Sequence, residues 1–277
     1  MHVTVRRRSE SMLITHVDGA EQRRRPDELI VEEPMSIQLD GAPVTTTMRT
    51  PGHDFELAVG FLFTEGLLAG AAVQGVRYCG TGSAVATEFN VVTVETGGVA
   101  PRPTARLGTT TSSCGWCGTD AIDDLGTRLE PLAPSAAISL DVLRDMPKRV
   151  VDAQSLFAAT GAVHAAAAFD RDGTVLLSRE DVGRHNAVDK VVGRMLLDGR
   201  LPARGLGLFV SGRASFELVQ KAWAAGFSTM VAVSAPTSLA VQTARRAGLV
   251  LAGFIRDDRI NVYAPERLPE GSAGGAA

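Results

Sequence analysis

Two cysteines in a Cys-x-x-Cys arrangement, Cys114 and Cys117, are the residues of this chain whose type and spacing most directly suggest chemistry. They lie in the segment TTTSSCGWCGTD, where Gly115 and Gly118 follow the two cysteines and a Thr- and Ser-rich passage precedes them. Two thiols at this spacing can close a disulfide, share a soft metal ion or carry sulfur as a persulfide.

Each option makes a different demand on the rest of the chain. A structural zinc site needs four ligands, and beyond this pair only Cys79 and His185 could be added, so we expect no metal site. A thioredoxin-like site needs its first cysteine at a helix N-terminus, whereas the next helix is expected to begin near Asp120. A sulfur carrier needs reach, which a glycine-flanked cysteine on a long polar loop provides. The residues around the cysteine pair therefore leave two functions open, a sulfur carrier and a thiol-disulfide redox site.

The sequence pattern changes from residue 162 onward. Near-continuous apolar strands alternate there with amphipathic helices, which is typical of a sheet covered by helices on both faces. We therefore expect a three-layer α/β C-terminal domain with a mixed, mostly parallel sheet. The expected strands are 162–169, 175–178, 207–210, 229–234, 249–255 and 260–263, and the expected helices are 186–197, 216–225 and 238–247.

Three junctions between strand and helix are polar, reading REDVGRHN, SGRAS and SAPTS. In such sheets ligands bind outside the carboxyl ends of the strands, where helix N-termini offer unpaired amides. Each Ser or Thr could equally be a helix cap, but three polar junctions together favour an anionic, phosphate-bearing ligand. Lys190, in the middle of a helix, fits an exposed ion pair equally well. The candidate residues are Arg184, His185, Ser211, Gly212, Arg213, Ser215, Thr237 and Ser238.

The first half of the chain is expected to form a smaller α+β part. Asp40-Gly41 predicts a hairpin, and Asp54 is predicted to cap a helix that runs to Glu65. Pro147 is predicted to open a helix that ends before Gly161. The predicted divisions are a poorly ordered extension over 1–28, an α+β part over 29–135 that ends in the cysteine loop, an α/β ligand-binding domain over 136–268, and a flexible tail over 269–277.

The composition excludes several classes of protein. Lys and Arg number 28 against 31 Asp and Glu, a net charge of −3, so no general excess of positive charge would attract nucleic acid or a membrane surface. Three cysteines are too few for a secreted disulfide scaffold, and no apolar run reaches the length of a membrane span. We expect a cytoplasmic protein.

Six segments, in this order and at these spacings, resemble the accessory sulfurtransferases of formate dehydrogenase. The resemblance covers about Leu29 to Tyr263. The segments are MRTPGHDFELAVGFLFTEGL (48–67), SSCGWCG (112–118), SREDVGRHNAVDKVVG (178–193), SGRASFELVQKA (211–222), VSAPTSLAV (233–241) and GFIRDDRINVY (253–263).

The resemblance implies a sulfurtransferase that accepts sulfur from a cysteine desulfurase as a persulfide and passes it to the bis(guanine dinucleotide) molybdenum cofactor. Formate dehydrogenase, dependent on molybdenum or tungsten, would receive that cofactor. The resemblance implies that the persulfide forms on Cys114, with Cys117 as a supporting or alternate thiol, and that the protein is a homodimer. It also implies a cofactor-binding stretch near the C-terminus, made of Phe254, Ile255, Arg256, Asp257, Asp258 and Arg259. The alternatives are a non-catalytic cofactor chaperone and a thiol-disulfide oxidoreductase.

The family also resembles cytidine deaminases in fold. Deaminases need a zinc-binding His-x-Glu followed by Pro-Cys-x-x-Cys, whereas His164 is followed by two alanines and the cysteine pair precedes it. Deaminase chemistry is therefore excluded, and His164 is expected to be a core histidine.

Overall fold

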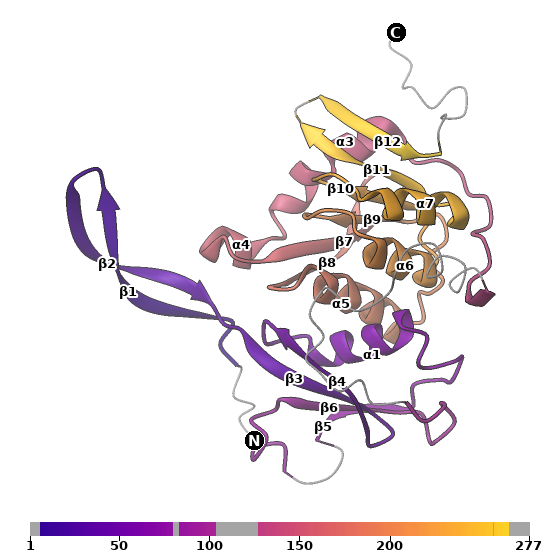
Figure 1. Ribbon diagram of the computed structural model, residues 1–277, viewed down its shortest axis with the longest axis horizontal. Helices are drawn as coiled ribbons and strands as arrows, with labels where there is room; N and C mark the ends of the chain where they lie inside the picture. Colours follow the sequence, from indigo (N-terminus) through magenta and orange to yellow (C-terminus); the bar gives the residue numbers. More distant parts are fainter. Residues whose placement is uncertain (1–5, 80–82, 104–126, 257, 266–277) are drawn as a thin grey trace.

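The computed structural model describes residues 6–79, 83–103, 127–256 and 258–265. They form a six-stranded sheet, a four-stranded sheet and a two-stranded ribbon that projects from the body (Figure 1). The large sheet has the order β12-β11-β10-β9-β7-β8. Its strands are β7 (His164–Phe169), β8 (Val175–Asp181), β9 (Gly207–Val210), β10 (Thr229–Ala232), β11 (Val250–Arg256) and β12 (Arg259–Ala264).

The large sheet is mixed, and the expectation that it is mostly parallel is wrong. Only β10 pairs in parallel, with β9 on one side and β11 on the other. The pairs β7–β8, β7–β9 and β11–β12 are antiparallel. Two of these pairs are hairpins, because β8 and β12 each turn back directly on the preceding strand, and the third arises because β7 runs opposite to β9.

A helix layer covers each face of the large sheet, as the sequence predicts. Ala166 and Ala168 of β7 pack toward one set of helices, while Ala167 and Phe169 pack toward the opposite face, because successive strand residues point to opposite sides. The first face is covered by α5 (Arg184–Leu197), α6 (Phe216–Ala225) and α7 (Ser238–Ala247), and the second by α3 (Leu140–Val151).

The small sheet has the order β4-β3-β6-β5 and packs against α1 (Asp54–Thr64). The predicted hairpin at Asp40-Gly41 is present, and it joins β3 to β4. The strands are β3 (Glu33–Leu39), β4 (Ala42–Arg49), β5 (Gly75–Tyr78) and β6 (Val91–Glu95).

Helix α1 also packs on α5, so it joins the two sheets into one body (Figure 1). The crossing is made at Gly60 and Gly193. A Cβ atom on Gly60 would lie 1.8 Å from the carbonyl oxygen of Asp189, and one on Gly193 would lie 1.8 Å from that of Glu56. Glycine is therefore required at both positions, because the two helix backbones are in contact there.

The segment around Pro147 differs from the sequence prediction. Helix α3 begins at Leu140, where the hydroxyl of Ser139 accepts a hydrogen bond from Val142 N at 3.3 Å, and Pro147 lies inside the helix. A second short helix, α4 (Ser155–Thr160), ends at Gly161 in the left-handed conformation, as predicted. Proline is common at the first position of a helix, but here the Ser139 cap sets the start.

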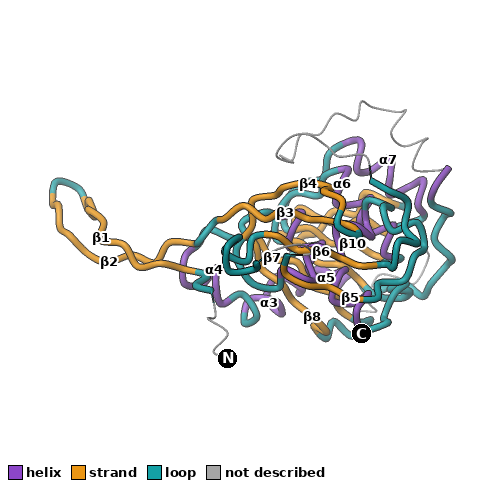
Figure 2. Tube along the Cα trace, turned by 90° about the horizontal axis from the view of Figure 1, so that it is seen from below, coloured by secondary structure: helices purple, strands orange, loops and turns teal. Residues whose placement is uncertain are grey.

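The N-terminal residues also differ from the prediction of a poorly ordered extension. β1 (Ser9–Asp18) and β2 (Glu21–Ile30) form an antiparallel ribbon, which we call the arm (Figure 2). Most arm residues are exposed, and the sequence carries no alternation of apolar and polar residues to reveal the strands. The signal that was available is Asp18-Gly19, with Gly19 at a positive φ in a two-residue turn.

Candidate functional site: the polar edge of the large sheet

The predicted polar junctions and the C-terminal stretch lie side by side at one edge of the large sheet. Ser211 N donates to Ala165 O at 2.9 Å, Ser234 N donates to Gly212 O at 3.3 Å, and Phe254 N donates to Ser234 O at 3.2 Å. These backbone bonds join the ends of β9, β10 and β11 with the start of β7. We call this region the polar edge; it comprises residues 164, 181–186, 211–215, 234–238, 253–256, 258 and 259.

Hydroxyl groups at the polar edge divide into structural and available ones. Thr237 caps α7, accepting from Ala240 N at 3.2 Å, so its capping role is confirmed. Ser211 Oγ accepts from Ala165 N at 2.9 Å and ties β9 to β7. Ser215 precedes α6 but makes no side-chain cap, and its Oγ lies 3.4 Å from His185 Nε2. Capping therefore does not explain Ser215, whose hydroxyl interacts with His185 and with the carboxylate of Glu217.

Gly212 lies between two basic side chains at this edge. A Cβ atom on Gly212 would lie 3.4 Å from His164 Nδ1 and 3.7 Å from Arg184 Cδ. The Nε of Arg184 is buried and has no hydrogen-bond partner among the described residues. A buried guanidinium N–H without a partner costs free energy unless a ligand accepts from it. This donor, beside the glycine, suits an anionic oxygen.

His164 belongs to this edge rather than to the core, which corrects the expectation for it. It is half-buried, it is the first residue of β7, and it pairs with Asp181 across the hairpin. Burial lowers the pKa of His164, and the positive charges of Arg184 and His185 lower it further, against an opposing effect of Asp181. The imidazole is therefore neutral at pH 7 and can donate or accept a hydrogen bond.

An acidic residue also lies at this edge, which the sequence reasoning missed. Glu217 Oε2 is 3.7 Å from His185 Nε2 at the start of α6. Its contact with His185 lowers the pKa of Glu217 to about 2, against the opposing effect of burial. An ionised Glu217 holds His185 and repels anions from α6, so an anionic ligand is better placed on the Gly212 and Arg184 side.

The C-terminal stretch forms an exposed hairpin tip beside the end of β10. Phe254 has a positive φ of 57° at a β-bulge, and the Arg256 guanidinium lies 5.1 Å from its ring centre. Arg256 also donates to Val233 O at 3.3 Å. Asp258 and Arg259 are exposed. Ile255 is buried and packs into the core beneath the tip. Asp257 lies outside the described residues.

The remaining candidates differ in accessibility. Arg213 and Ser238 are exposed at the edge. Lys190 is fully buried, with its Nζ 2.6 Å from Asp181 Oδ2 and 3.0 Å from Thr50 O, so the expected exposed ion pair is wrong. The periodicity of the helix could not show this, because Asp181 lies on β8 and not on α5.

Both cysteines of the pair lie outside the described residues. Cys79 is buried, directly after β5. Across the described ranges, no group of three or more His, Cys, Asp or Glu side chains could hold a metal ion. No described helix has both the length and the apolar character needed to cross a membrane.

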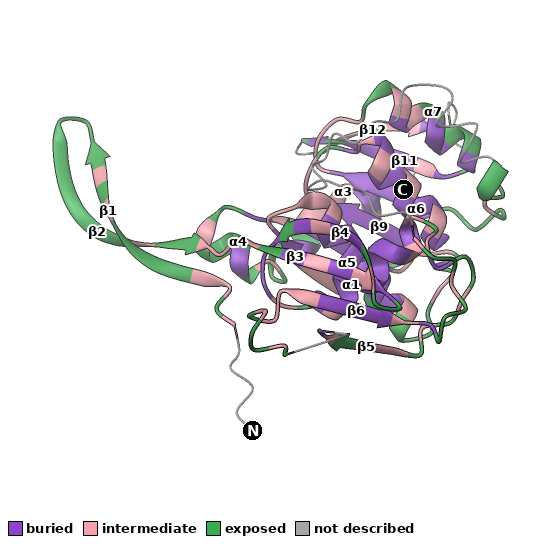
Figure 3. Cartoon of the chain, turned by 60° about the horizontal axis from the view of Figure 1, so that its bottom comes forward, coloured by how far each residue is buried: buried purple, intermediate pink, exposed green. Residues whose placement is uncertain are grey.

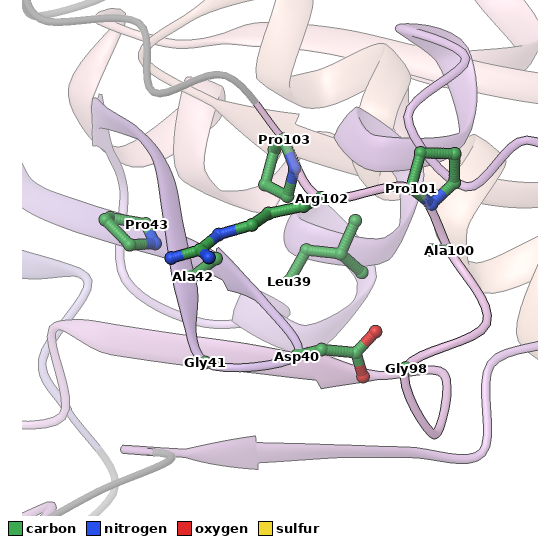
Figure 4. A pocket seen from close by; sticks show the side chains of 10 residues that line it. All are labelled: Leu39, Asp40, Gly41, Ala42, Pro43, Gly98, Ala100, Pro101, Arg102 and Pro103. Carbon is green, nitrogen blue, oxygen red and sulfur yellow. The ribbon is translucent and has the colours of Figure 1, made fainter.

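A separate pocket of about 490 Å³ lies at the turn between β3 and β4 (Figure 4). The Asp40 carboxylate in its wall is already used, because it accepts from Thr96 N at 2.7 Å and from Thr96 Oγ1 at 2.5 Å. None of the predicted site residues lines this pocket, so it does not belong to the polar edge. Its lining residues are Leu39, Asp40, Gly41, Ala42, Pro43, Gly98, Ala100, Pro101, Arg102 and Pro103.

The fold and the polar edge define a two-sheet α/β protein with polar and basic side chains gathered at one edge of its large sheet and, by sequence, a separate cysteine-pair loop. A model of the FdhD/NarQ family matches residues 30–269, and the chain belongs to this family. This confirms the resemblance found in the sequence.

Two relatives show how far the similarity extends. The sulfur carrier protein FdhD of Mycolicibacterium paratuberculosis is 48% identical over 270 residues, covering 95% of this chain and 97% of the relative. The protein of the same name from Streptomyces coelicolor is 48% identical over 256 residues, covering 89% and 90%. A crystal structure of a candidate formate dehydrogenase accessory protein from Desulfotalea psychrophila shares the fold, with a TM-score of 0.72 at 24% identity over 94% of this chain and 99% of that one.

Proposed function

We propose that this protein is a sulfurtransferase that carries sulfur as a persulfide on Cys114 and transfers it to the bis(guanine dinucleotide) molybdenum cofactor for formate dehydrogenase. The relatives named sulfur carrier protein FdhD support the carrier role. The donor is a cysteine desulfurase. Its persulfide passes the outer sulfur to the Cys114 thiolate, which leaves a thiolate on the desulfurase and a persulfide on Cys114 with no net oxidation.

The observation that carries the acceptor half of the proposal is the unpaired, buried Nε of Arg184 beside Gly212. A guanine dinucleotide carries phosphates, and their oxygens are the acceptors that this donor lacks. Neutral His164 supplies a further polar contact from β7. Arg256 and Arg259 are exposed at the hairpin tip and supply positive charge there. The net charge of the whole chain is −3, but binding of an anion depends on the charges close to the site. The cofactor is treated as cargo, taken up and released.

Complementation of formate dehydrogenase activity separates this proposal from the two alternatives. In cells that lack their own copy of this protein, Cys114→Ala is expected to abolish formate dehydrogenase activity while the purified variant still binds guanosine diphosphate. A cofactor chaperone would keep the activity in Cys114→Ala. A thiol-disulfide oxidoreductase would lose activity equally in Cys114→Ala and Cys117→Ala, and both proteins would exchange disulfides rapidly with a thioredoxin-type partner.

A further inference from the structure

Most of the arm projects away from the body, although α4 packs against β2. Its strands pair residue by residue from Ser9 opposite Ile30 to Asp18 opposite Glu21, which makes a ribbon about 33 Å long. Figure 3 shows it exposed along nearly its whole length, in contrast to the buried strands of the body. A lone two-stranded ribbon is marginally stable in water, so the arm needs a further contact to be a lasting structure.

The base of the arm is fixed to the body. Val31 N donates to Arg8 O at 2.9 Å and closes the ribbon where it leaves the small sheet. Arg6 contacts Glu33 and donates to Asn90 Oδ1 at 2.8 Å. Burial lowers the pKa of Arg8, while the charges of Glu180 and Asp181 raise it, so this guanidinium stays charged beside the body's acidic groups. These anchors give the arm a defined direction.

The two long edges of the arm differ in character. β2 carries three consecutive arginines, Arg23 to Arg25, followed by Pro26 and two acids. Charge and proline are the features that keep edge strands from pairing with another chain. β1 carries neither Asp, Glu, Lys, Arg nor Pro from Ser11 to Val17. It exposes Met12, Leu13 and Val17 instead, with Leu13 60% exposed. The edge of β1 is therefore open to strand pairing, and the edge of β2 is guarded.

We propose that β1 pairs antiparallel with β1 of a second copy of this chain, so that two arms form one four-stranded sheet centred on Leu13. A two-fold axis requires a residue to face itself, and only certain registers avoid like charges. With Leu13 facing Leu13, Met12 faces Ile14 and Glu10 faces His16. Centring on Ile14 instead would place Glu10 opposite Asp18 of the second copy, and pairing β2 with β2 would bring the arginine triplets together.

This interface is independent of the proposed sulfur chemistry. The resemblance to the family implies a homodimer but does not say which surface makes it. The arm, residues 9–30, adjoins the matched residues 30–269 at Ile30. A second copy of β1 is favoured over a strand from another protein, because two β1 strands can pair in the register centred on Leu13 without bringing like charges together.

A cross-link tests the register directly. Leu13→Cys places one cysteine from each copy opposite the other, with Cβ atoms about 4.5–5.5 Å apart, so mild oxidation is expected to give a covalent dimer through the peptide containing residue 13. Val17→Cys is the matched control, because its two copies would lie about 26 Å apart along the paired strands. Both variants are made with Cys114 and Cys117 replaced by serine. Equal cross-linking at both positions, or at neither, contradicts the proposed register.

Sedimentation equilibrium of the full chain tests the edge assignment. Leu13→Lys puts two positive charges opposite each other on the open edge and is expected to raise the dimer dissociation constant by about tenfold or more. Gln22→Lys adds the same charge to the guarded β2 edge and is expected to leave the constant nearly unchanged. A wild-type protein that is monomeric at all concentrations, or a dimer equally stable in Leu13→Lys, would overturn the proposal. Dimerisation weakened only by Gln22→Lys would overturn it too.

Discussion

The ammonium group of Lys190 lies 2.6 Å from Oδ2 of Asp181, and both side chains are fully buried. The other carboxylate oxygen of Asp181 accepts from Gly183 N at 2.8 Å and from Asn186 Nδ2 at 3.0 Å. The pair therefore fixes the turn between β8 and α5. Arg184 is the first residue of α5 and directly follows that turn, so the buried ion pair sets the position of the Arg184 donor at the polar edge.

Removing one member of this pair should be costly. Lys190→Met leaves the Asp181 carboxylate buried without its counter-charge, and breaking a buried pair in this way typically costs about 3–5 kcal/mol of unfolding free energy. Urea denaturation measures the loss. Arg144→Met is the control, because Arg144 pairs with Asp141 at the surface and should cost less than about 1 kcal/mol. Equal losses in the two variants would contradict the assignment.

The contact between α1 and α5 predicts intolerance of any side chain at the crossing. Gly60→Ala would place a Cβ atom 1.8 Å from a backbone oxygen, so the helices must separate, and we expect a loss above the about 1–3 kcal/mol typical of overpacking. Gly41→Ala meets nothing within 4 Å and carries only the strain of its positive φ, about 1–2 kcal/mol. Thermal unfolding followed by circular dichroism compares the two. A smaller effect at Gly60 than at Gly41 would contradict the packing.

Glu56 predicts a pH-dependent contribution to stability. Burial would raise the pKa of Glu56, but the hydrogen bonds from Arg179 and His53 and their charges lower it to about 2. A carboxyl whose pKa is depressed by folding stabilises the protein above its unfolded value and loses that effect as the pH falls toward 2. Wild type should therefore exceed Glu56→Gln by about 2 kcal/mol at pH 7, and the difference should shrink between about pH 4.5 and pH 2. A difference that is constant over this range would exclude the ionic role.

Charge at the hairpin tip should matter to the nucleotide and not to sulfur loading. Arg259→Ala is expected to weaken binding of guanosine diphosphate by about tenfold, the loss of one charge-assisted contact, with unchanged persulfide formation on Cys114. Isothermal titration calorimetry measures the binding. Arg171→Ala is the control, because Arg171 is an exposed arginine in the β7–β8 turn at the opposite edge of the sheet. Unchanged nucleotide binding in Arg259→Ala would remove the tip from the site.

Local signals in the sequence predicted the helices and strands well. They could not predict side-chain contacts between residues that lie in different elements. Asp40-Gly41 marked a hairpin and Thr237 marked a helix start, because each acts on its own neighbours. The burial of Lys190 depends on Asp181 from another element. The Arg6 to Arg8 triplet looked like a solvated run of charge, although its partners Glu33 and Asn90 lie far along the chain.

For the site, the sequence predicted which segments would meet but not how each side chain would be used. The strand-to-helix junctions share one edge because β8, β9 and β10 run in the same direction and therefore end together. Whether Ser211, Ser215 or Thr237 was the cap depended on local geometry, and only Thr237 is one. The unpaired Arg184 Nε has no counterpart in the sequence.

Mass spectrometry of the protein after reaction with a cysteine desulfurase and L-cysteine tests the central claim most directly. We expect one added sulfur atom, about 32 Da, on the peptide that contains Cys114, removable by reductant and absent when L-cysteine is omitted. Cys114→Ser should lose this mass while it keeps its affinity for guanosine diphosphate. Added sulfur found only on Cys79, or loading unaffected by Cys114→Ser, would contradict a carrier that works through Cys114.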